Sequence, residues 1–128
     1  TEDALILKYD EFGNVAWAKN IGNNSNDEIK CVCATDDGGC VAVGIFQYSI
    51  VVGEYTLASN GNHNGMIIKY SADGEVEFAK SIGGADTDNL LSVCTTSDGG
   101  YLVVGNFRSN IIVEGISLLN MDMLVNFH

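Results

Sequence analysis

The chain contains one stretch of sequence twice. Residues 8–57 align with residues 69–118 at a constant offset of 61 positions and without a gap, and 21 of the 50 aligned residues are identical. A gap-free match of this quality indicates two copies of one structural unit. We therefore read the 128 residues as a single repeat domain, with repeat one at 3–61, repeat two at 64–121 and the start of a third repeat at 122–128.

Both copies consist of short segments with the composition of β-strands, separated by polar turns. The chain has no proline, so Gly, Asn and Asp must form its turns. No segment of useful length places apolar residues at i, i+3, i+4 and i+7. The sequence therefore predicts an all-β protein with almost no helix. Strands are expected at residues 3–9, 15–21, 28–35, 40–46, 66–70, 76–82, 90–96 and 101–107, with small hairpins at 50–57 and 111–118.

The strand expected at 15–21 alternates large and small side chains. Trp17 lies on one face, and Ala16 and Ala18 lie on the other. The alanine face predicts close packing against another sheet. Because Trp17 and Phe78 occupy equivalent positions in the two copies, we expect both rings to pack inside the domain rather than to bind sugar.

A repeat of 61 residues with four strands and a hairpin fits one blade of a β-propeller. We therefore expect an all-β fold of β-propeller blades, with two repeats of about 61 residues per chain, as part of a larger or oligomeric propeller. A β-sandwich of two pseudo-equivalent halves is the alternative.

The order and spacing of the repeated motifs extend over nearly the whole chain. They comprise Asp-apolar-Lys-Tyr, a turn Gly, aromatic-Ala-Lys, Ile-Gly, Asp-Gly-Gly and Val-Gly-x-Phe. The residues that carry these motifs are Asp3, Lys8, Gly13, Trp17, Gly22, Asp37, Gly38, Gly39 and Gly44, with second-copy counterparts Lys69, Gly74, Phe78, Gly83, Asp98, Gly99, Gly100 and Gly105. In these motifs the chain resembles the bacterial SBBP-type β-propeller repeat family. The resemblance implies a fold to which no reaction and no cofactor is attached, and therefore no catalytic residues.

The resemblance also implies a strand order within the complete blade. Residues 28–35 would form the innermost strand, followed outward by 40–46, 66–70 and 76–82. The chain would then begin halfway through one blade and end inside another. Since propellers have about four to eight blades, two blades cannot close a ring. We expect self-association of three or four copies into a closed ring, or the remaining blades of a longer chain.

Two further expectations concern the ends of the chain. The strand-like segment Asp122–Phe127 resembles the start of a repeat, and we expect it to complete a neighbour's blade by strand exchange. Thr1 in place of an initiator methionine predicts a processed product or a cloned fragment.

The net charge of −11 restricts the partners of this chain. An acidic surface repels phosphate backbones and anionic membrane leaflets, which argues against nucleic-acid partners. No apolar run approaches the ~20 residues of a spanning helix, which argues against membrane insertion. We expect a non-enzymatic interaction or scaffold module with a protein or glycan ligand, extracellular or at a bacterial cell surface.

Two polar loops, 22–27 and 83–89, are expected on one rim of the propeller, where ligands commonly bind. Their Asn and Asp side chains could bind sugar hydroxyls or calcium, or could hydrogen-bond their own turns. Asp86–Asn89 lacks the central Gly and distal Glu of a calcium loop, so we expect no metal. Tyr48 and Tyr55 are the aromatic candidates. The candidate ligand residues are Asn23, Asn24, Asn26, Asp27, Asp86, Asp88, Asn89, Tyr48 and Tyr55.

The residues that serve most enzymes are scarce here. The chain has one arginine and two histidines, His63 and His128, neither of which recurs in the other copy. We therefore expect no catalytic site and no cofactor. The cysteines lie in strand-like runs, which predicts free buried thiols. One disulfide or a zinc site is the alternative. The four cysteines are Cys31, Cys33, Cys40 and Cys94.

Overall fold

The computed structural model describes residues 3–22, 25–59, 62–84, 86–108 and 110–118. These residues form β-strands and turns, and no helix occurs among them. The strands are β1 (Ala4–Tyr9), β2 (Val15–Ile21), β3 (Glu28–Ala34), β4 (Cys40–Phe46), β5 (Ser49–Val52), β6 (Tyr55–Ala58), β7 (Asn64–Tyr70), β8 (Val76–Ile82), β9 (Asp88–Thr95), β10 (Tyr101–Phe107), β11 (Ile111–Val113) and β12 (Ile116–Leu118). The all-β prediction is confirmed. The expected segment Asp122–Phe127 lies outside the described residues.

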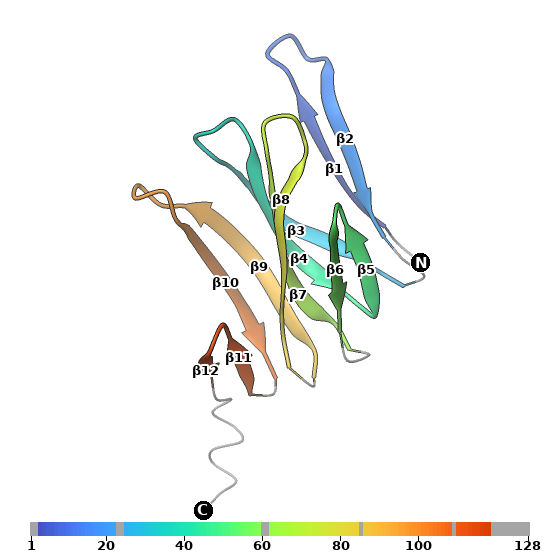
Figure 1. The fold of residues 1–128 in the computed structure, drawn as a ribbon, viewed down its shortest axis with the longest axis vertical. Helices are drawn as coiled ribbons and strands as arrows, with labels where there is room; N and C mark the ends of the chain where they lie inside the picture. Colours follow the sequence, from blue (N-terminus) through green and yellow to red (C-terminus); the bar gives the residue numbers. More distant parts are fainter. Residues whose placement is uncertain (1–2, 23–24, 60–61, 85, 109, 119–128) are drawn as a thin grey trace, which may run out of the picture.

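A four-stranded antiparallel sheet with the order β3-β4-β7-β8 forms the centre of the molecule (Figure 1). This is the strand order that the family resemblance implied for one blade. The other strands form four separate hairpins, β1-β2, β5-β6, β9-β10 and β11-β12. The offset of 61 makes β1-β2 the counterpart of β7-β8, and makes β9-β10 the counterpart of β3-β4.

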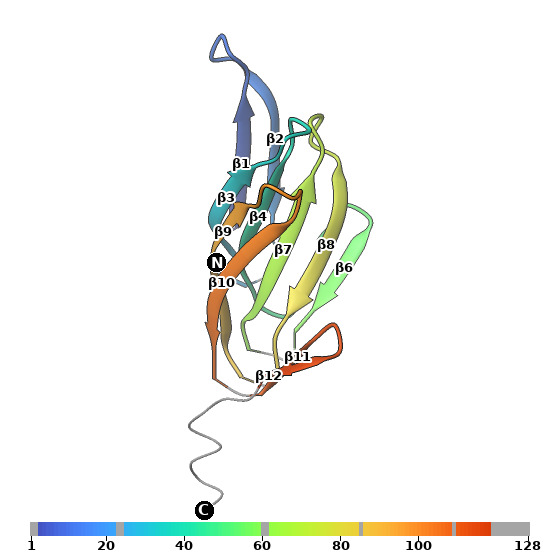
Figure 2. The same cartoon turned by 90° about the vertical axis from the view of Figure 1, so that its left-hand side faces the viewer.

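The hairpins cover the central sheet from both sides, which gives three layers (Figures 1 and 2). The β1-β2 hairpin lies beside one face of the sheet, and β9-β10 packs along β3, β4 and β7 on the other. The small hairpins β5-β6 and β11-β12 both contact β8. Since the described sheets share no hydrogen-bonded edge, the described part of the chain is an open stack rather than a closed barrel.

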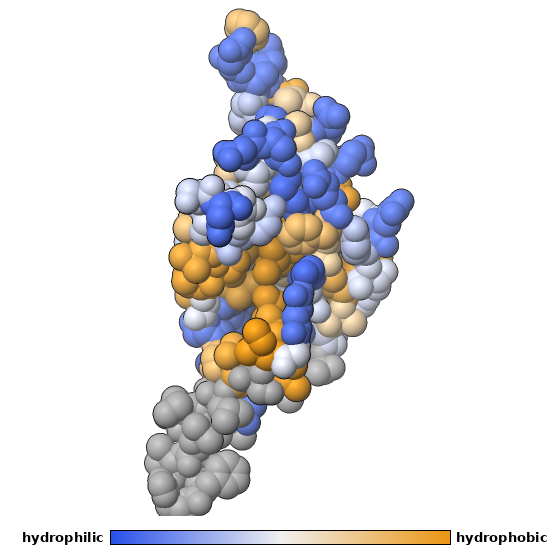
Figure 3. Space-filling model, turned by 60° about the vertical axis from the view of Figure 1, so that its left-hand side comes forward, coloured by the Kyte–Doolittle hydropathy of each residue, from blue (hydrophilic) through white to orange (hydrophobic). Residues whose placement is uncertain are grey.

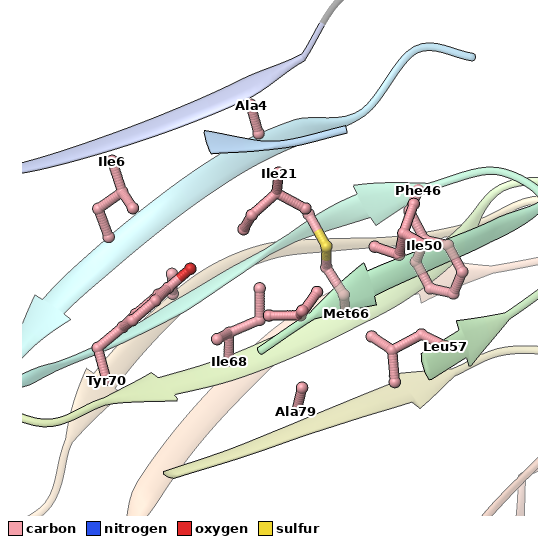
Figure 4. Packing of buried hydrophobic residues seen from close by; sticks show 12 residues of the cluster. Ala4, Ile6, Ile21, Phe46, Ile50, Leu57, Met66, Ile68, Tyr70 and Ala79 are labelled. Carbon is pink, nitrogen blue, oxygen red and sulfur yellow. The ribbon is translucent and has the colours of Figure 1, made fainter. Parts of the chain in front are cut away.

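Two apolar clusters hold the layers together. The first cluster lies between β1-β2, the hairpin β5-β6 and the central sheet, and contains Ile6, Met66, Ile68 and Tyr70 (Figure 4). The second lies between the central sheet and β9-β10, around Val41, Val43 and Val93. Full burial of a side chain of this size stabilises the fold by about 1.5–3 kcal/mol.

The ring of Trp17 packs against the ring of Tyr70, with 5.4 Å between their centroids. Its indole N–H also donates a hydrogen bond to the carbonyl oxygen of Ala72, 3.1 Å away. The expectation that Trp17 packs inside the domain is confirmed. The packing expected on the alanine face of β2 is not seen within the described chain, because Ala16 and Ala18 are exposed and the Trp17 face meets the central sheet.

Glycine is required where the two strands of each inner hairpin approach closely. A Cβ on Gly44 would lie 1.9 Å from the carbonyl oxygen of Glu28, and one on Gly105 would lie 2.0 Å from that of Asn89. Both glycines lie at or next to register shifts between the paired strands. The same backbone contact therefore explains the same glycine in both copies.

Lys69 is a buried cation that ties β7 to the turn between β3 and β4. Its Nζ lies 3.0 Å from Oδ2 of Asp37 and 3.5 Å from Oε1 of Glu77, and it donates to the carbonyl oxygen of Tyr70. Burial alone would lower the pKa of Lys69, but the carboxylates of Asp37 and Glu77 together outweigh burial, and the net pKa is raised. Hydrogen bonds from Thr35, Gly39 and Lys69 hold the pKa of Asp37 well below its usual range.

All four cysteines are free, as predicted. They are less buried than expected, since Cys31, Cys33 and Cys40 are half-buried and Cys94 is exposed. Cys94 is the second-copy counterpart of Cys33, but its face of β9 has no layer over it among the described residues. None of the described segments forms a helix with the length and apolar character needed to cross a bilayer.

Candidate functional site

Asp88, in the second polar loop, is buried with an exposed fraction of 3%. Its Oδ2 accepts a hydrogen bond from the backbone N–H of Gly84 at 2.9 Å, and its own N–H donates to the carbonyl oxygen of His63. Burial raises the pKa of Asp88, and the backbone N–H groups of Gly84 and Arg108 oppose that shift. This carboxylate therefore fixes the loop at the start of β9.

Asp27 has the same position in the first polar loop and is 1% exposed. Its Oδ1 accepts from the backbone N–H of Gln47 at 3.4 Å, just beyond the end of β4. Ser25 reaches the same residue, since its hydroxyl lies 2.8 Å from Oε1 of Gln47. The burial of Asp27 and Asp88 favours the turn-forming interpretation of both over direct ligand contact.

The remaining polar candidates lie nearer the surface. Asn26 is exposed, whereas Asp86 and Asn89 are half-buried. Oδ1 of Asp86 accepts from the N–H of Thr87 at 2.7 Å. Nδ2 of Asn89 donates to Oδ1 of Asn106 at 3.0 Å, so this side chain links β9 to β10. Asn23 and Asn24 lie outside the described residues.

The two tyrosines have different settings. Tyr48 is 56% exposed and follows Gln47, so it lies beside the first polar loop. Tyr55 lies on β6, and its hydroxyl donates to the carbonyl oxygen of Glu77 on β8 at 2.8 Å. The structure thus brings Asn26 and Tyr48 to neighbouring loops, and it gives Tyr55 a structural hydrogen bond.

A large apolar cavity, which the sequence did not predict, opens between β8, β9-β10 and β11-β12. Its volume is about 460 Å³, and Figure 3 shows apolar side chains gathered on this side of the molecule. Asp88 and Asn89 form part of its wall. Its apolar lining is Ile82, Leu90, Val103, Phe107, Ile111, Val113, Ile116 and Leu118.

The lining of this cavity repeats the lining of the first apolar cluster. At an offset of 61, Ile82 corresponds to Ile21 and Phe107 corresponds to Phe46, and the earlier member of each pair is fully packed. In the first cluster β7 supplies the facing wall with Met66. No described strand supplies the equivalent wall here, because β10 pairs only with β9 in the described chain. The repeat offset is the sequence signal that could have located the cavity.

A second hollow of about 290 Å³ lies at the opposite end of the stack, between β1 and β3. Ile6, Leu7 and Val32 line it together with the turn around Gly38. Val32 is 52% exposed, although its second-copy counterpart Val93 is 5% exposed in the second cluster. Both ends of the stack are therefore hollowed where a further layer would pack.

Nothing in the described part of the chain groups three or more His, Cys, Asp or Glu side chains as metal ligands. A scan of the sequence against protein-family models finds no match, and a search of the curated proteins finds none either. The geometry that bears on function is thus the pair of uncovered apolar faces and the polar loops beside them.

Proposed function

We propose that this chain is a non-enzymatic β-propeller repeat module for protein interaction or scaffolding at a bacterial cell surface. Its two flanks would be covered by further blades, which come from other copies or from a longer chain. In this proposal the central sheet β3-β4-β7-β8 would be the one complete blade among the described elements, and the hairpins β1-β2 and β9-β10 would be halves of two neighbouring blades.

The observation that supports this proposal is a difference in burial between equivalent positions. Leu5 and Leu7 on β1 are 62% and 41% exposed, whereas their counterparts Met66 and Ile68 on β7 are both 0% exposed. β1 and β7 have the same type of sequence, so the difference in exposure arises from the layer that covers β7. A repeat that keeps large apolar residues on an uncovered face predicts that the face is covered in the working protein.

The energetics support the same conclusion. Each covered side chain of this size would contribute about 1.5–3 kcal/mol, and a folded domain is stable by only about 5–15 kcal/mol in total. Several such residues on each flank therefore amount to a large fraction of the stability. A module of this kind acts through the surface of a rigid ring, and its acidic charge of −11 favours partners without a dense negative charge.

The solution mass tests this proposal. Light scattering on the chromatographed chain should give a mass of three or four times 13.6 kDa, since two blades per copy then give six or eight blades, within the range of about four to eight. Negative-stain images of that species should show a closed ring. A well-folded monomer at micromolar concentration would contradict self-association and leave only the longer-chain form.

A carbohydrate-binding propeller with one site per blade is the second candidate, favoured by the exposed Asn26 and Tyr48 on neighbouring loops. Amide groups that hydrogen-bond hydroxyls next to an aromatic ring are typical of sugar sites. The interaction module is preferred because Asp27 and Asp88 are used by the fold itself. Specific binding on a glycan array, abolished by Tyr48→Ala, would reverse this preference.

A further inference from the structure

We propose that β10 of one copy pairs with β1 of a second copy, in the register that β4 and β7 adopt within one chain. This inference rests on the proposed function, because it specifies how copies of the module would close a ring. The occupant of each uncovered flank is then the opposite flank of an identical chain.

The strand edges provide the first argument. β4 is hydrogen-bonded on both sides, to β3 and β7, and β7 is hydrogen-bonded to β4 and β8. Their repeat counterparts β10 and β1 each have one partner among the described strands, β9 and β2 respectively. Among the described strands, these two unpaired edges are therefore the two halves of a junction that the chain already makes once. Unpaired edges of this kind are templates for pairing with another chain.

The register follows from the same equivalence. Within the central sheet Cys40 is opposite Tyr70, and Ala42 is opposite Ile68. Adding 61 to the first strand and subtracting 61 from the second places Tyr101 opposite the second copy's Tyr9. Leu7 of the second copy then lies opposite Val103. Residues directly opposite in an antiparallel pair share a face, so a shift by one residue would reverse every contact.

The cavity provides the second argument. Val103 faces the central sheet and lines the 460 Å³ cavity, so the second copy's Leu7 would enter that cavity beside it. Leu5 of the second copy would follow two residues along on the same face. Their counterparts Met66 and Ile68 fill the equivalent space in the first apolar cluster. The wall that no described strand supplies to the cavity is thus the face that β1 leaves exposed.

The opposite flank is complementary in the same way. Leu102 and Val104 on β10 are 58% and 54% exposed, and their counterparts Val41 and Val43 are 0% exposed in the second cluster. In the proposed pairing these two residues face the central sheet of the second copy, where that copy's Val32 lines the 290 Å³ hollow. The contact between β10 and the second copy's β1 therefore covers the 460 Å³ cavity of one copy and the 290 Å³ hollow of the other.

The proposed register also brings opposite charges of the two copies together. Asp98 is the counterpart of Asp37, and Lys8 is the counterpart of Lys69. Within one chain Asp37 and Lys69 form an ion pair at 3.0 Å. The composite blade would place Asp98 of one copy near the second copy's Lys8. The contact is head-to-tail, so repeated around an axis it closes into a ring in which each copy supplies one full blade and two halves.

Disulfide trapping tests the register. Tyr9 and Tyr101 are 57% and 38% exposed, so Tyr9→Cys and Tyr101→Cys change no core residue. The two single variants are mixed, unfolded and refolded together, and then oxidised. Peptide mass mapping should find the 9–101 disulfide in the mixture and in neither variant alone, and it separates this link from the native cysteines. The matched control pairs Tyr9→Cys with Leu102→Cys, one residue out of register and on the opposite face, and should give at least tenfold less cross-link.

The outcomes separate this inference from the proposed function. A ring that forms without the 9–101 link, or that gives the 9–102 link in equal yield, would overturn the register and leave the ring. A folded monomer, including one in which residues 119–128 of the same chain cover β10, would overturn both the register and self-association. If a cysteine variant does not fold, the wild-type ring still tests the register. A reagent that couples carboxyl groups to amines should link Asp98 of one copy to Lys8 of the next, and peptide mapping after digestion would detect that link.

Discussion

The hairpins β1-β2 and β7-β8 are two copies of one sequence unit with different surroundings. Ala79 on β8 is 7% exposed in the first apolar cluster, whereas the identical Ala18 on β2 is exposed. Lys69 is buried among carboxylates, whereas Lys8 donates to the carbonyl oxygens of Gly38 and Ala72. The same residues therefore have different energetic roles, and the adjacent layer decides which role each one has.

The largest expected effect is on assembly. Leu7→Glu places a charge on the face that the second copy's cavity would cover, and burying an unpaired charge is very costly. The measured mass should fall from that of the ring to 13.6 kDa while circular dichroism stays that of β-sheet. The control is Phe12→Glu, at a turn residue that is 81% exposed, and it should keep the ring. Equal dissociation by both variants would contradict the assignment of the interface to β1.

The next prediction compares the buried copy of one repeat position, Ile68, with its exposed copy, Leu7. Ile68→Ala removes a fully buried side chain and should lower the free energy of unfolding by about 2–5 kcal/mol at every protein concentration. Leu7→Ala should cost less than about 1 kcal/mol in the dilute monomer and more as the ring forms. Urea titrations at two concentrations measure both. A concentration-independent cost for Leu7→Ala would remove the link between this residue and assembly.

A smaller loss of stability is expected when the equivalent glycines of the two copies are substituted. Gly44→Ala forces a Cβ against the Glu28 carbonyl in the central sheet, and should cost about 1–3 kcal/mol through strain. Gly105→Ala makes the same clash in β9-β10. Because this hairpin has one neighbouring layer in the monomer, the variant should expose the amides of β10 to hydrogen exchange before those of β4. Equal protection in both strands would contradict the difference between the layers.

The smallest effect concerns pH. Burial raises the pKa of Tyr70 to about 12, so its neutral form is favoured in the folded chain. Stability from this group is complete below the unfolded tyrosine pKa of about 10, and is lost as the pH rises towards 12. The raised pKa of Lys69 acts in the same direction. The urea midpoint should therefore fall between pH 9 and 11.5, and Tyr70→Phe should fall less. Identical pH profiles would contradict a buried, neutral Tyr70.

The sequence predicted the strands well because local chemistry sets their boundaries. The turns of the type Asp-Gly-Gly require residues that accept positive φ, and Gly38 and Gly99 both have φ +86°. Strand boundaries were predicted to within two residues for this reason. The alanine face is exposed on β2 and buried at Ala79 on β8, and residue size does not reveal which copy of a strand has a neighbour on that face.

The candidate site was predicted less well. The sequence predicts Asp27 and Asp88 as polar groups in loops, which they are, but their burial and backbone hydrogen bonds depend on how the loops fold over the ends of β4 and β10. The 460 Å³ cavity could not be read from any single motif, since its walls come from β8, β9-β10 and β11-β12. Only the equivalence of its lining with the first cluster connects it to the repeat.

By itself the sequence determined the unit: its length, its strands, its turns and the apolar residues kept at the same positions in both copies. Those features follow from backbone sterics and side-chain periodicity, which act within a few residues. The tertiary structure decided which copy of each position is covered, which edge is paired and where the hollows lie. These properties depend on contact between segments far apart in the chain, and burial is a property of such contacts rather than of the residue.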